Sequence, residues 1–380
     1  MTEQRDIVVI GAGPAGSMAA REAARAGLRP LLIERAPTPG ARKACGGAAA
    51  YAFRELLALP PEVVECGMHR ARLRLGAETV EVVGRRPLYA SFHRAAFDAY
   101  LAERAVQAGA ELWTSTRATA VDPASGRIAL RDLATRRERE VAARILIFAD
   151  GPRTLALPAF GIGHRGDHAP ASAAYVELDG DAAEPDVMEL IAEPALQPPG
   201  YFWVFPKRGR VQVGVGEPRV ARGESLWRHL ERFVEARPDL RGRAVVARNA
   251  GLVPTERARE FVADRAMVAG DAAGLVNPLT GEGICYALVS GTLAGRVAAR
   301  ALQAGRTDRA ALSAYPRRLR RTLAYLWHEW LTRRCRQVEQ LGPSRWPEAY
   351  HQLLLRYFRR LRAMPWIVGF LARHGGPVAK

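Results

Sequence analysis

The chain has 380 residues, 48% of them hydrophobic and 25% charged, which is typical of a folded globular protein and excludes disorder as the main state. No run of about 18 apolar residues is present, so we expect no transmembrane helix, and a predicted strand at residues 7–10 leaves no room for a signal peptide. The four cysteines have no zinc-type spacing. We therefore expect reduced thiols in a cytoplasmic protein and no metal site.

The net charge of +17 is distributed unevenly along the chain. Residues 317–380 carry thirteen arginines and Lys380 against three glutamates, which amounts to +11, so the rest of the chain is only mildly basic. A nucleic-acid-binding role would have to rest on this segment alone. Because the segment contains no recognisable recognition module, we expect no nucleic-acid partner.

The first elements predicted are a strand, a glycine-rich turn, a helix and a second strand. Residues 7–10 form a continuous apolar run, as expected of a buried parallel strand. The turn is GAGPAG at residues 11–16, and residues 17–26 favour a helix that ends at a glycine. Residues 29–33 predict the second strand. This order is that of one βαβ nucleotide-binding unit.

The turn has the GxGxxG spacing of a dinucleotide site. Gly11, Gly13 and Gly16 permit a tight turn and a close approach of the backbone to a pyrophosphate at the helix N-terminus. Glu34, at the tip of the second strand, is placed to accept hydrogen bonds from ribose hydroxyls. At this point the dinucleotide could be either NAD or FAD.

The remaining elements predict an α/β fold in which a Rossmann-type domain is interrupted by an antiparallel sheet. Residues 95–108 predict a helix, residues 118–150 a short β-meander, and alternating apolar residues follow in the next hundred positions. Three domains are expected. A discontinuous FAD-binding domain occupies 1–154 and 262–304, and a β-rich substrate domain occupies 155–261, with part of 68–93 as a candidate to join its sheet. Residues 305–380 form a basic helical C-terminal region.

The segment at residues 267–284 favours FAD over NAD. A buried strand leads to Asp271, whose carboxylate could bind the ribityl chain. Gly281 and Gly283 then open a long helix, whose free amides would face the pyrimidine edge of the flavin. That edge is negative in the reduced flavin, and a helix N-terminus stabilises negative charge.

These motifs, with RAAFDAYL at residues 94–101 and the Asp-Gly pair at 150–151, resemble the flavoprotein superfamily of aromatic hydroxylases. Two further segments narrow the resemblance. KACGG at residues 43–47 and YFWVFP at 201–206 are similar to the KxCGG and YxWxFP motifs of geranylgeranyl reductases. The resemblance spans about residues 5–300.

The resemblance implies a set of FAD-binding residues and one catalytic candidate. The FAD-binding set is Gly11, Gly13, Ala15, Gly16, Glu34, Arg35, Cys45, Gly46, Gly47, Arg94, Ala118, Asp271, Gly281, Gly283 and Ile284. The catalytic candidate is Cys45, as a proton donor or modulator beside the isoalloxazine ring. The same sequence would also be found if Cys45 were only a small, buried structural residue.

The second motif predicts a substrate-binding face. Tyr201, Trp203 and Phe205 alternate along a predicted strand, so all three face one side, and Pro206 is expected to end the strand. We assign these four residues to substrate binding, because an aromatic face suits a prenyl chain; an ordinary half-buried strand is the alternative. Lys43 and Lys207, two of only three lysines, adjoin the two motifs.

The resemblance implies an FAD-dependent reductase that saturates isolated C=C bonds of a geranylgeranyl chain. Such alkenes lack an activating carbonyl, so a proton must reach one carbon as hydride reaches the other. A flavin-dependent monooxygenase or halogenase on the same fold is the alternative. Since only one dinucleotide fingerprint is present, the electron donor is expected to be NADPH bound transiently or a ferredoxin docked on the basic surface.

The C-terminal region interleaves arginines with aromatic residues over positions 317–373. Helical spacing places five residues on one apolar face with arginines around it: Leu353, Leu354, Tyr357, Phe358 and Leu361. One interpretation is a helical cap packed on the catalytic core. The other is peripheral attachment to an anionic membrane at its inner face, with the aromatic side chains at headgroup depth.

Overall fold

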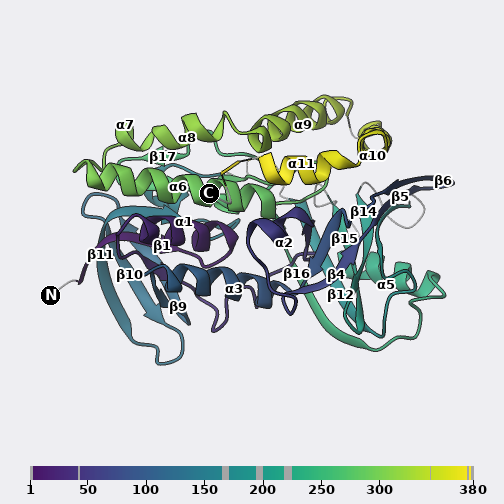
Figure 1. The fold of residues 1–380 in the computed structure, drawn as a ribbon, viewed down its shortest axis with the longest axis horizontal. Helices are drawn as coiled ribbons and strands as arrows, with labels where there is room; N and C mark the ends of the chain where they lie inside the picture. Colours follow the sequence, from purple (N-terminus) through teal and green to yellow (C-terminus); the bar gives the residue numbers. More distant parts are fainter. Residues whose placement is uncertain are drawn as a thin grey trace.

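The computed structural model describes residues 3–41, 43–164, 171–193, 200–217, 225–342, 344–374 and 376–377. Figure 1 shows a nucleotide-binding part at the left, a second sheet at the right, and the C-terminal helices along the upper side of both. The mixed α/β architecture is the one predicted.

The first sheet has a parallel core. Its order is β17-β18-β11-β1-β2-β8, and β9 and β10 extend it from β11. β1 (Glu3–Ile10) lies parallel between β2 (Leu31–Ile33) and β11 (Glu138–Phe148), and its apolar residues 7–10 are buried as predicted. The other strands are β8 (Glu111–Trp113), β9 (Thr116–Asp122), β10 (Arg127–Asp132), β17 (Val262–Ala263) and β18 (Ala266–Val268).

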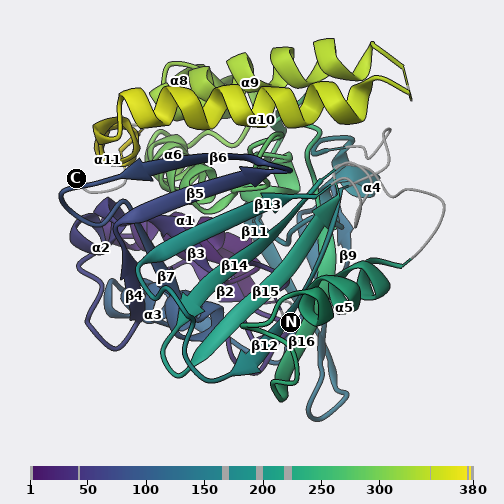
Figure 2. The same ribbon diagram turned by 90° about the vertical axis from the view of Figure 1, so that its right-hand side faces the viewer.

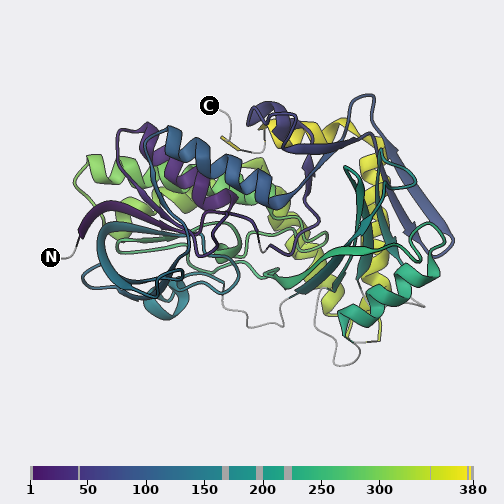
Figure 3. The same cartoon turned by 90° about the horizontal axis from the view of Figure 1, so that it is seen from below.

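Helices α1 (Pro14–Arg25) and α6 (Ile284–Gln303) lie side by side over this sheet, with α3 (Arg94–Gln107) against α1 (Figures 1 and 3). The two helices are in close contact at Gly291, where an added Cβ would lie only 2.0 Å from the Ala15 carbonyl oxygen. Only glycine fits at this crossing. The close packing brings the N-terminal ends of α1 and α6 to the same edge of the sheet.

The second sheet has seven strands in the order β16-β12-β15-β14-β13-β5-β6. All neighbours are antiparallel except β13 and β5. Its strands are β5 (Arg70–Leu75), β6 (Glu78–Val83), β12 (Ala171–Asp179), β13 (Val187–Ala192), β14 (Tyr201–Lys207), β15 (Arg210–Glu217) and β16 (Val245–Val253). Two strands from the N-terminal half of the chain thus form one edge of the sheet.

Strand β14 does not end at Pro206, contrary to the prediction. It continues to Lys207, which pairs with Arg210 across a two-residue turn, and Pro206 pairs with Val211. Lys207 and Arg210 form the hydrogen-bonded pair next to the turn, so the following pair, Pro206 and Val211, is a non-hydrogen-bonded pair. The missing N–H of proline therefore removes no hydrogen bond between β14 and β15. The carbonyl of Pro206 accepts a hydrogen bond from the Ser91 hydroxyl at 2.7 Å.

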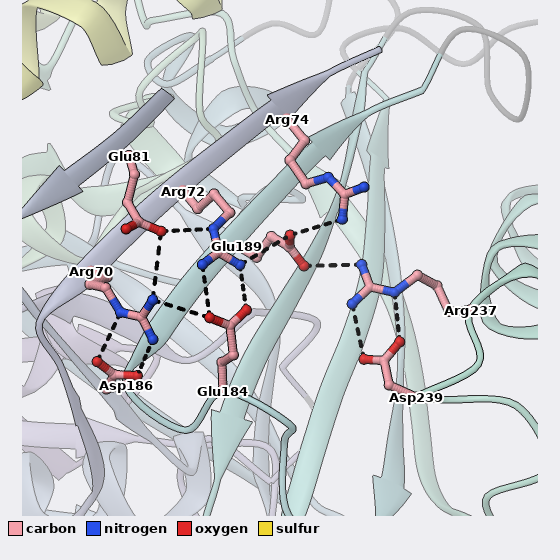
Figure 4. A network of polar contacts seen from close by, with 9 residues as sticks. All are labelled: Arg70, Arg72, Arg74, Glu81, Glu184, Asp186, Glu189, Arg237 and Asp239. Carbon is pink, nitrogen blue, oxygen red and sulfur yellow. Dashed lines mark hydrogen bonds and ion pairs between the residues drawn. The ribbon is translucent and has the colours of Figure 1, made fainter. Parts of the chain in front are cut away.

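A network of charged side chains ties β5 to its neighbours (Figure 4). The Arg70 guanidinium donates to Asp186 at 2.7 Å, and Arg72 donates to Glu81 at 2.8 Å and also to Glu184. The hydrogen bond from Arg70 holds the pKa of Asp186 below its usual value. Because residues alternate along the strand, the opposite face of β5 is left to apolar side chains that pack against a helix.

The C-terminal helices cover that apolar face. Helix α10 (Trp346–Ala363) runs along β5 and β6, as Figures 2 and 3 show. Leu354, Phe358 and Leu361 are buried with the apolar residues of β5 and β6. The predicted apolar face of this helix therefore packs on the protein. No helix of the described ranges combines the length and the hydropathy that crossing a membrane requires.

The remaining elements connect these layers. A small third sheet has the order β3-β7-β4. Its strands are β3 (Ala48–Ala50), β4 (Val64–Met68) and β7 (Tyr89–Phe92). The other helices are α2 (Ala52–Leu56), α4 (Ala156–Phe160), α5 (Leu226–Ala236), the 3-10 helix η1 (Gly270–Ala273), α7 (Arg309–Leu312), α8 (Ala314–Leu319), α9 (Leu323–Glu339) and α11 (Trp366–His374).

Candidate functional site

The GxGxxG turn is held by backbone contacts that exclude side chains. Gly11 has a φ of +100°, and a Cβ there would lie 2.3 Å from the Ala149 carbonyl oxygen. A Cβ on Gly16 would lie 1.8 Å from the Gly11 carbonyl oxygen. Gly13 differs, because among the described residues no atom beyond its own chain neighbours lies within 4 Å of the position its Cβ would take. The space beside Gly13 is therefore available to a ligand.

That space suits a pyrophosphate. Gly13 is the N-cap residue of α1, and no side chain caps this helix. Its first amides can therefore bind an anion. The Glu34 carboxylate accepts hydrogen bonds from the amides of Ala12 at 3.0 Å and Ala36 at 2.8 Å, which holds it beside the turn.

The other residues expected near the adenosine half lie around Glu34. Arg35 is exposed next to it, and Ala118 is buried in β9, whose first residue, Thr116, donates its amide hydrogen to the Glu34 carbonyl at 2.9 Å. Asp150 lies near Arg35, and burial raises its pKa to about 6. Its Oδ1 atom is buried and has no hydrogen-bond partner among the described residues. An orphaned acceptor at this place fits a bound hydroxyl group.

The second FAD segment meets the first at the start of α1. A Cβ on Gly270 would lie 2.9 Å from the Ala15 Cβ, so the turn that carries Asp271 passes directly over α1. The Asp271 carboxylate is 3.4 Å from the Lys43 ammonium. A Cβ on Gly283 would lie 3.4 Å from Asp271 Oδ1. The fold thus brings both predicted halves of the FAD site together.

The N-terminus of α6 carries a carboxyl group that the sequence analysis did not single out. Glu282 lies between Gly281 and Gly283, and its Oε1 atom accepts a hydrogen bond from the Cys285 amide at 2.8 Å. Burial raises the pKa of Glu282 to about 7, with the charge of Asp271 adding to the effect. The sequence signal was present in the Gly-Glu-Gly triplet, but it does not reveal burial.

Cys45 lies between a buried arginine and the backbone of its own loop. Its Sγ atom accepts a hydrogen bond from the Gly47 amide at 3.4 Å, and Arg94 also hydrogen-bonds to the thiol. Arg94 forms two hydrogen bonds with the Asp98 carboxylate, at 3.0 and 2.7 Å. Burial acts to lower the pKa of Arg94, but the charge of Asp98 and the hydrogen bonds to Asp98 and Cys45 outweigh it and raise the pKa. Arg94 therefore remains charged beside the thiol.

Neighbouring atoms leave no room for a side chain at the two glycine positions after Cys45. A Cβ on Gly46 would lie 2.5 Å from the Phe205 ring, and one on Gly47, which has a φ of +60°, would lie 2.3 Å from the Phe92 carbonyl oxygen. The buried Lys207 ammonium donates to the Gly47 carbonyl at 3.1 Å and to that of Phe92 at 2.9 Å. Lys207 thus anchors the Cys45 loop to β14.

A cavity of about 260 Å³ opens between this loop, the second sheet and the start of α6. Tyr201, Trp203 and Phe205 all line it, whereas Pro206 lies outside it, because alternation turns that residue to the other face of β14. The assignment of Pro206 to direct substrate binding is therefore corrected. A Cβ on Gly214 would lie 2.0 Å from the Trp203 ring, so the indole lies flat across the neighbouring strand.

The C-terminal helices form the remaining wall. They contribute Ala324, Trp327, Tyr350, Tyr357, Phe358, Leu361, Val368 and Leu371 to the cavity. The Tyr350 hydroxyl donates to the Leu279 carbonyl at 2.6 Å and joins α10 to the loop before α6. Tyr357 and Phe358 were predicted to share an apolar helix face, but helical periodicity alone could not show that this face meets a cavity, and Tyr350 was not predicted.

Related proteins match this chain over most of its length. Residues 6–372 match the family model described as lycopene cyclase protein. The chain is 36% identical over 331 residues to digeranylgeranylglycerophospholipid reductase 2 of Methanothermobacter thermautotrophicus, and the match covers 84% of each chain. It is 35% identical over 323 residues to digeranylgeranylglycerophospholipid reductase 1 of Methanopyrus kandleri, covering 82% of this chain and 84% of that protein.

Solved structures show the same relationship. A geranylgeranyl bacteriochlorophyll reductase-like protein from Thermoplasma acidophilum matches with a TM-score of 0.78 and 27% identity, covering 87% of this chain and 88% of that one. A myxobacterial chondrochloren halogenase matches with a TM-score of 0.72 at 18% identity, covering 98% and 97%, and shares the fold alone. From these similarities, together with the dinucleotide turn and the two motifs that meet at the cavity, the chain belongs to the geranylgeranyl reductase family of FAD-dependent oxidoreductases.

Proposed function

We propose that this protein saturates C=C bonds of a geranylgeranyl-type isoprenoid chain. The observation that carries the proposal is the aromatic cavity, which joins the Cys45 loop to the N-terminus of α6. Its walls are mostly aliphatic and aromatic, which suits a long prenyl chain. The two archaeal relatives, which are named as digeranylgeranylglycerophospholipid reductases, support the same substrate class.

Reduced FAD, when bound, supplies hydride for such a reduction. The residues of the chain bind and orient the substrate. Trp203 and Phe205 form one wall of the cavity and Trp327 and Tyr357 another, so that the alkene is held away from water. Gly46 leaves no side chain between the loop and the Phe205 ring. Cys45 is the candidate either to deliver a proton or to modulate the environment of the isoalloxazine ring.

Anaerobic turnover tests this function. Protein that has been reduced with dithionite and mixed with a geranylgeranyl substrate under argon is expected to give products that gain two hydrogen atoms for each double bond reduced. Mass spectrometry measures this gain. A monooxygenase or halogenase, the alternative on this fold, needs O₂ and would give no product under these conditions.

Replacement of Cys45 by serine tests its role. The variant is expected to keep its flavin absorbance and to turn over more slowly, because the cavity loses the thiol that lies beside Arg94. Cys66→Ser is the matched control, because Cys66 lies in β4 and does not line the cavity. Full turnover by the Cys45 variant would show that the assignment is wrong.

For the electron donor, we propose that a small acidic ferredoxin serves at least as well as NADPH. The net charge of +17 and the single dinucleotide fingerprint support this choice. The rate of flavin reduction by ferredoxin is expected to fall as salt is added. A rate that does not depend on salt would argue against electrostatic docking.

We propose that the protein attaches to anionic membranes through α11 rather than α10. Trp366 is 61% exposed and Phe370 40% exposed, while Val368 and Leu371 of the same helix line the cavity. One face of α11 thus closes the cavity and the other presents aromatic rings to the outside, with Arg373 at its C-terminal end. An anionic bilayer matches both the rings and the charge.

The double variant Trp366→Ser, Phe370→Ser is expected to lose binding to anionic vesicles in a co-sedimentation assay, and high salt is expected to weaken binding of the parent protein. Point variants are preferable to deletion of the C-terminal helices, because deletion would remove a wall of the cavity. Equal binding to neutral and anionic vesicles would contradict the proposal.

A further inference from the structure

A carboxyl group lines the otherwise mostly apolar cavity. Glu282 faces the same space as Cys45, Trp203 and Phe205. It forms no ion pair with any Lys, Arg or His of the described residues. A carboxylate without a cation in such surroundings is costly, so the site favours the neutral acid.

Backbone amides at the start of α6 hold this carboxyl group in place. The Cys285 amide donates to Oε1 at 2.8 Å, and the Ile284 amide contributes a second hydrogen bond. Both partners are donors. Within the described part of the chain, the hydrogen bonds that hold this carboxyl group come from these two amides. The acidic proton is therefore left for a molecule in the cavity.

The tyrosine and cysteine side chains beside Glu282 whose pKa values are raised stay neutral at pH 7. Tyr89, Tyr286 and Tyr357 stay neutral, because burial raises the pKa of each hydroxyl. Burial likewise raises the pKa of the Cys285 thiol well above its usual value. Two further carboxyl groups lie nearby: Asp271 faces Lys43 at 3.4 Å, and Glu217, which also lines the cavity, lies 3.9 Å from the His229 ring.

We propose that Glu282 is the acid that protonates the alkene. This inference rests on the proposed function and deepens it. The O–H bond of Glu282 breaks as the π electrons of the alkene form a new C–H bond. The neighbouring alkene carbon receives the hydride that reduced FAD supplies, so the flavin is oxidised and the alkene is reduced by two electrons. The carboxylate that remains regains its proton from water, and Cys45 acts as a modulator.

The main test is Glu282→Gln in the FAD-loaded protein. The amide oxygen of glutamine can still accept the hydrogen bond from the Cys285 amide, so FAD affinity should stay within about threefold of the parent value. The kcat is expected to fall by about 100-fold or more, with KM little changed. Glu282→Asp should restore part of the activity. Glu260→Gln, at an exposed ion pair with Arg309, is the matched control.

The pH dependence provides a second readout. Because the acid form is required and its pKa is raised to about 7, kcat of the parent enzyme is expected to fall as pH rises through about 7. The Cys45→Ser variant should keep this inflection, and Glu282→Gln should lose it. Infrared difference spectra of the resting protein, taken without substrate, should show a protonated carboxyl band that titrates near the same pH and is missing in Glu282→Gln.

Three results would overturn the inference. Parent-like turnover and pH profile in Glu282→Gln would exclude Glu282 as the acid. Loss of FAD binding together with turnover would assign Glu282 to cofactor positioning instead. A missing carboxyl band in the parent protein would contradict its neutral form. If the parent protein itself fails to reduce any prenyl substrate, the proposed function fails, and this role of Glu282 fails with it.

Discussion

Replacement of Gly16 by alanine is expected to abolish FAD binding and to lower the free energy of unfolding by about 3 kcal/mol or more, the upper end of the usual cost of overpacking. The new Cβ would lie 1.8 Å from the Gly11 carbonyl oxygen, which is backbone and cannot move aside without shifting the turn. Flavin content of the purified protein and chemical denaturation of the apoprotein measure the two effects.

Gly13→Ala is the matched variant for this prediction. No protein atom lies within 4 Å of the added methyl group, so the free energy of unfolding should change by about 0.5 kcal/mol or less. FAD affinity should nevertheless fall by about tenfold or more, because the methyl group enters the space assigned to the pyrophosphate. Unchanged FAD affinity in Gly13→Ala would show that the pyrophosphate binds elsewhere. Normal FAD binding by Gly16→Ala would show that the turn geometry is wrong.

Replacement of Gly214 by alanine is expected to lower kcat/KM for a prenyl substrate by about 100-fold while FAD stays bound. A Cβ at this position would lie 2.0 Å from the Trp203 ring, so the indole must leave the surface of β15 and reshape the cavity. Displacements of about 1 Å at a binding site commonly cost two orders of magnitude in rate. Steady-state kinetics and flavin content measure the effect.

Gly216→Ala is the comparison for this variant, since its Cβ would meet the Trp203 ring at 3.7 Å, an ordinary contact distance. Its loss of kcat/KM should be clearly smaller. Equal losses in the two variants would show that the effect comes from added volume in the cavity and not from movement of Trp203. Parent-like kinetics in Gly214→Ala would contradict the role of the indole as a fixed wall.

Local sequence patterns were sufficient for the nucleotide-binding part of the fold. The run at residues 7–10, the glycine-rich turn and the helix after it are defined by short-range effects, namely burial of a parallel strand and the φ angles that only glycine adopts readily. The same effects place Asp271 at a turn and a long helix directly after Gly283. The turns and helices that carry both expected halves of the FAD site were therefore predictable, and so was the α/β class.

The arrangement around the cavity was decided by contacts between distant parts of the chain. Lys207 anchors the Gly47 carbonyl across 160 positions, and Phe205 excludes a side chain at Gly46. Strands β5 and β6, which lie in the N-terminal half of the sequence, complete the second sheet. The segment 68–93 was a predicted candidate for this sheet, but the strand that β5 pairs with and the contacts of Lys207 and Phe205 were set only by the tertiary structure.

The C-terminal helices and Glu282 show why such contacts cannot be predicted from the sequence alone. Periodicity determines which residues of a helix or strand share a face, but it does not determine what that face meets. The apolar face of α10 fits a membrane and a sheet equally well by its pattern, and only packing against β5 and β6 shows that it covers the protein. In the same way, a glutamate between two glycines is an ordinary turn residue until the fold places it on the wall of a mostly apolar cavity, where its pKa is raised to about 7.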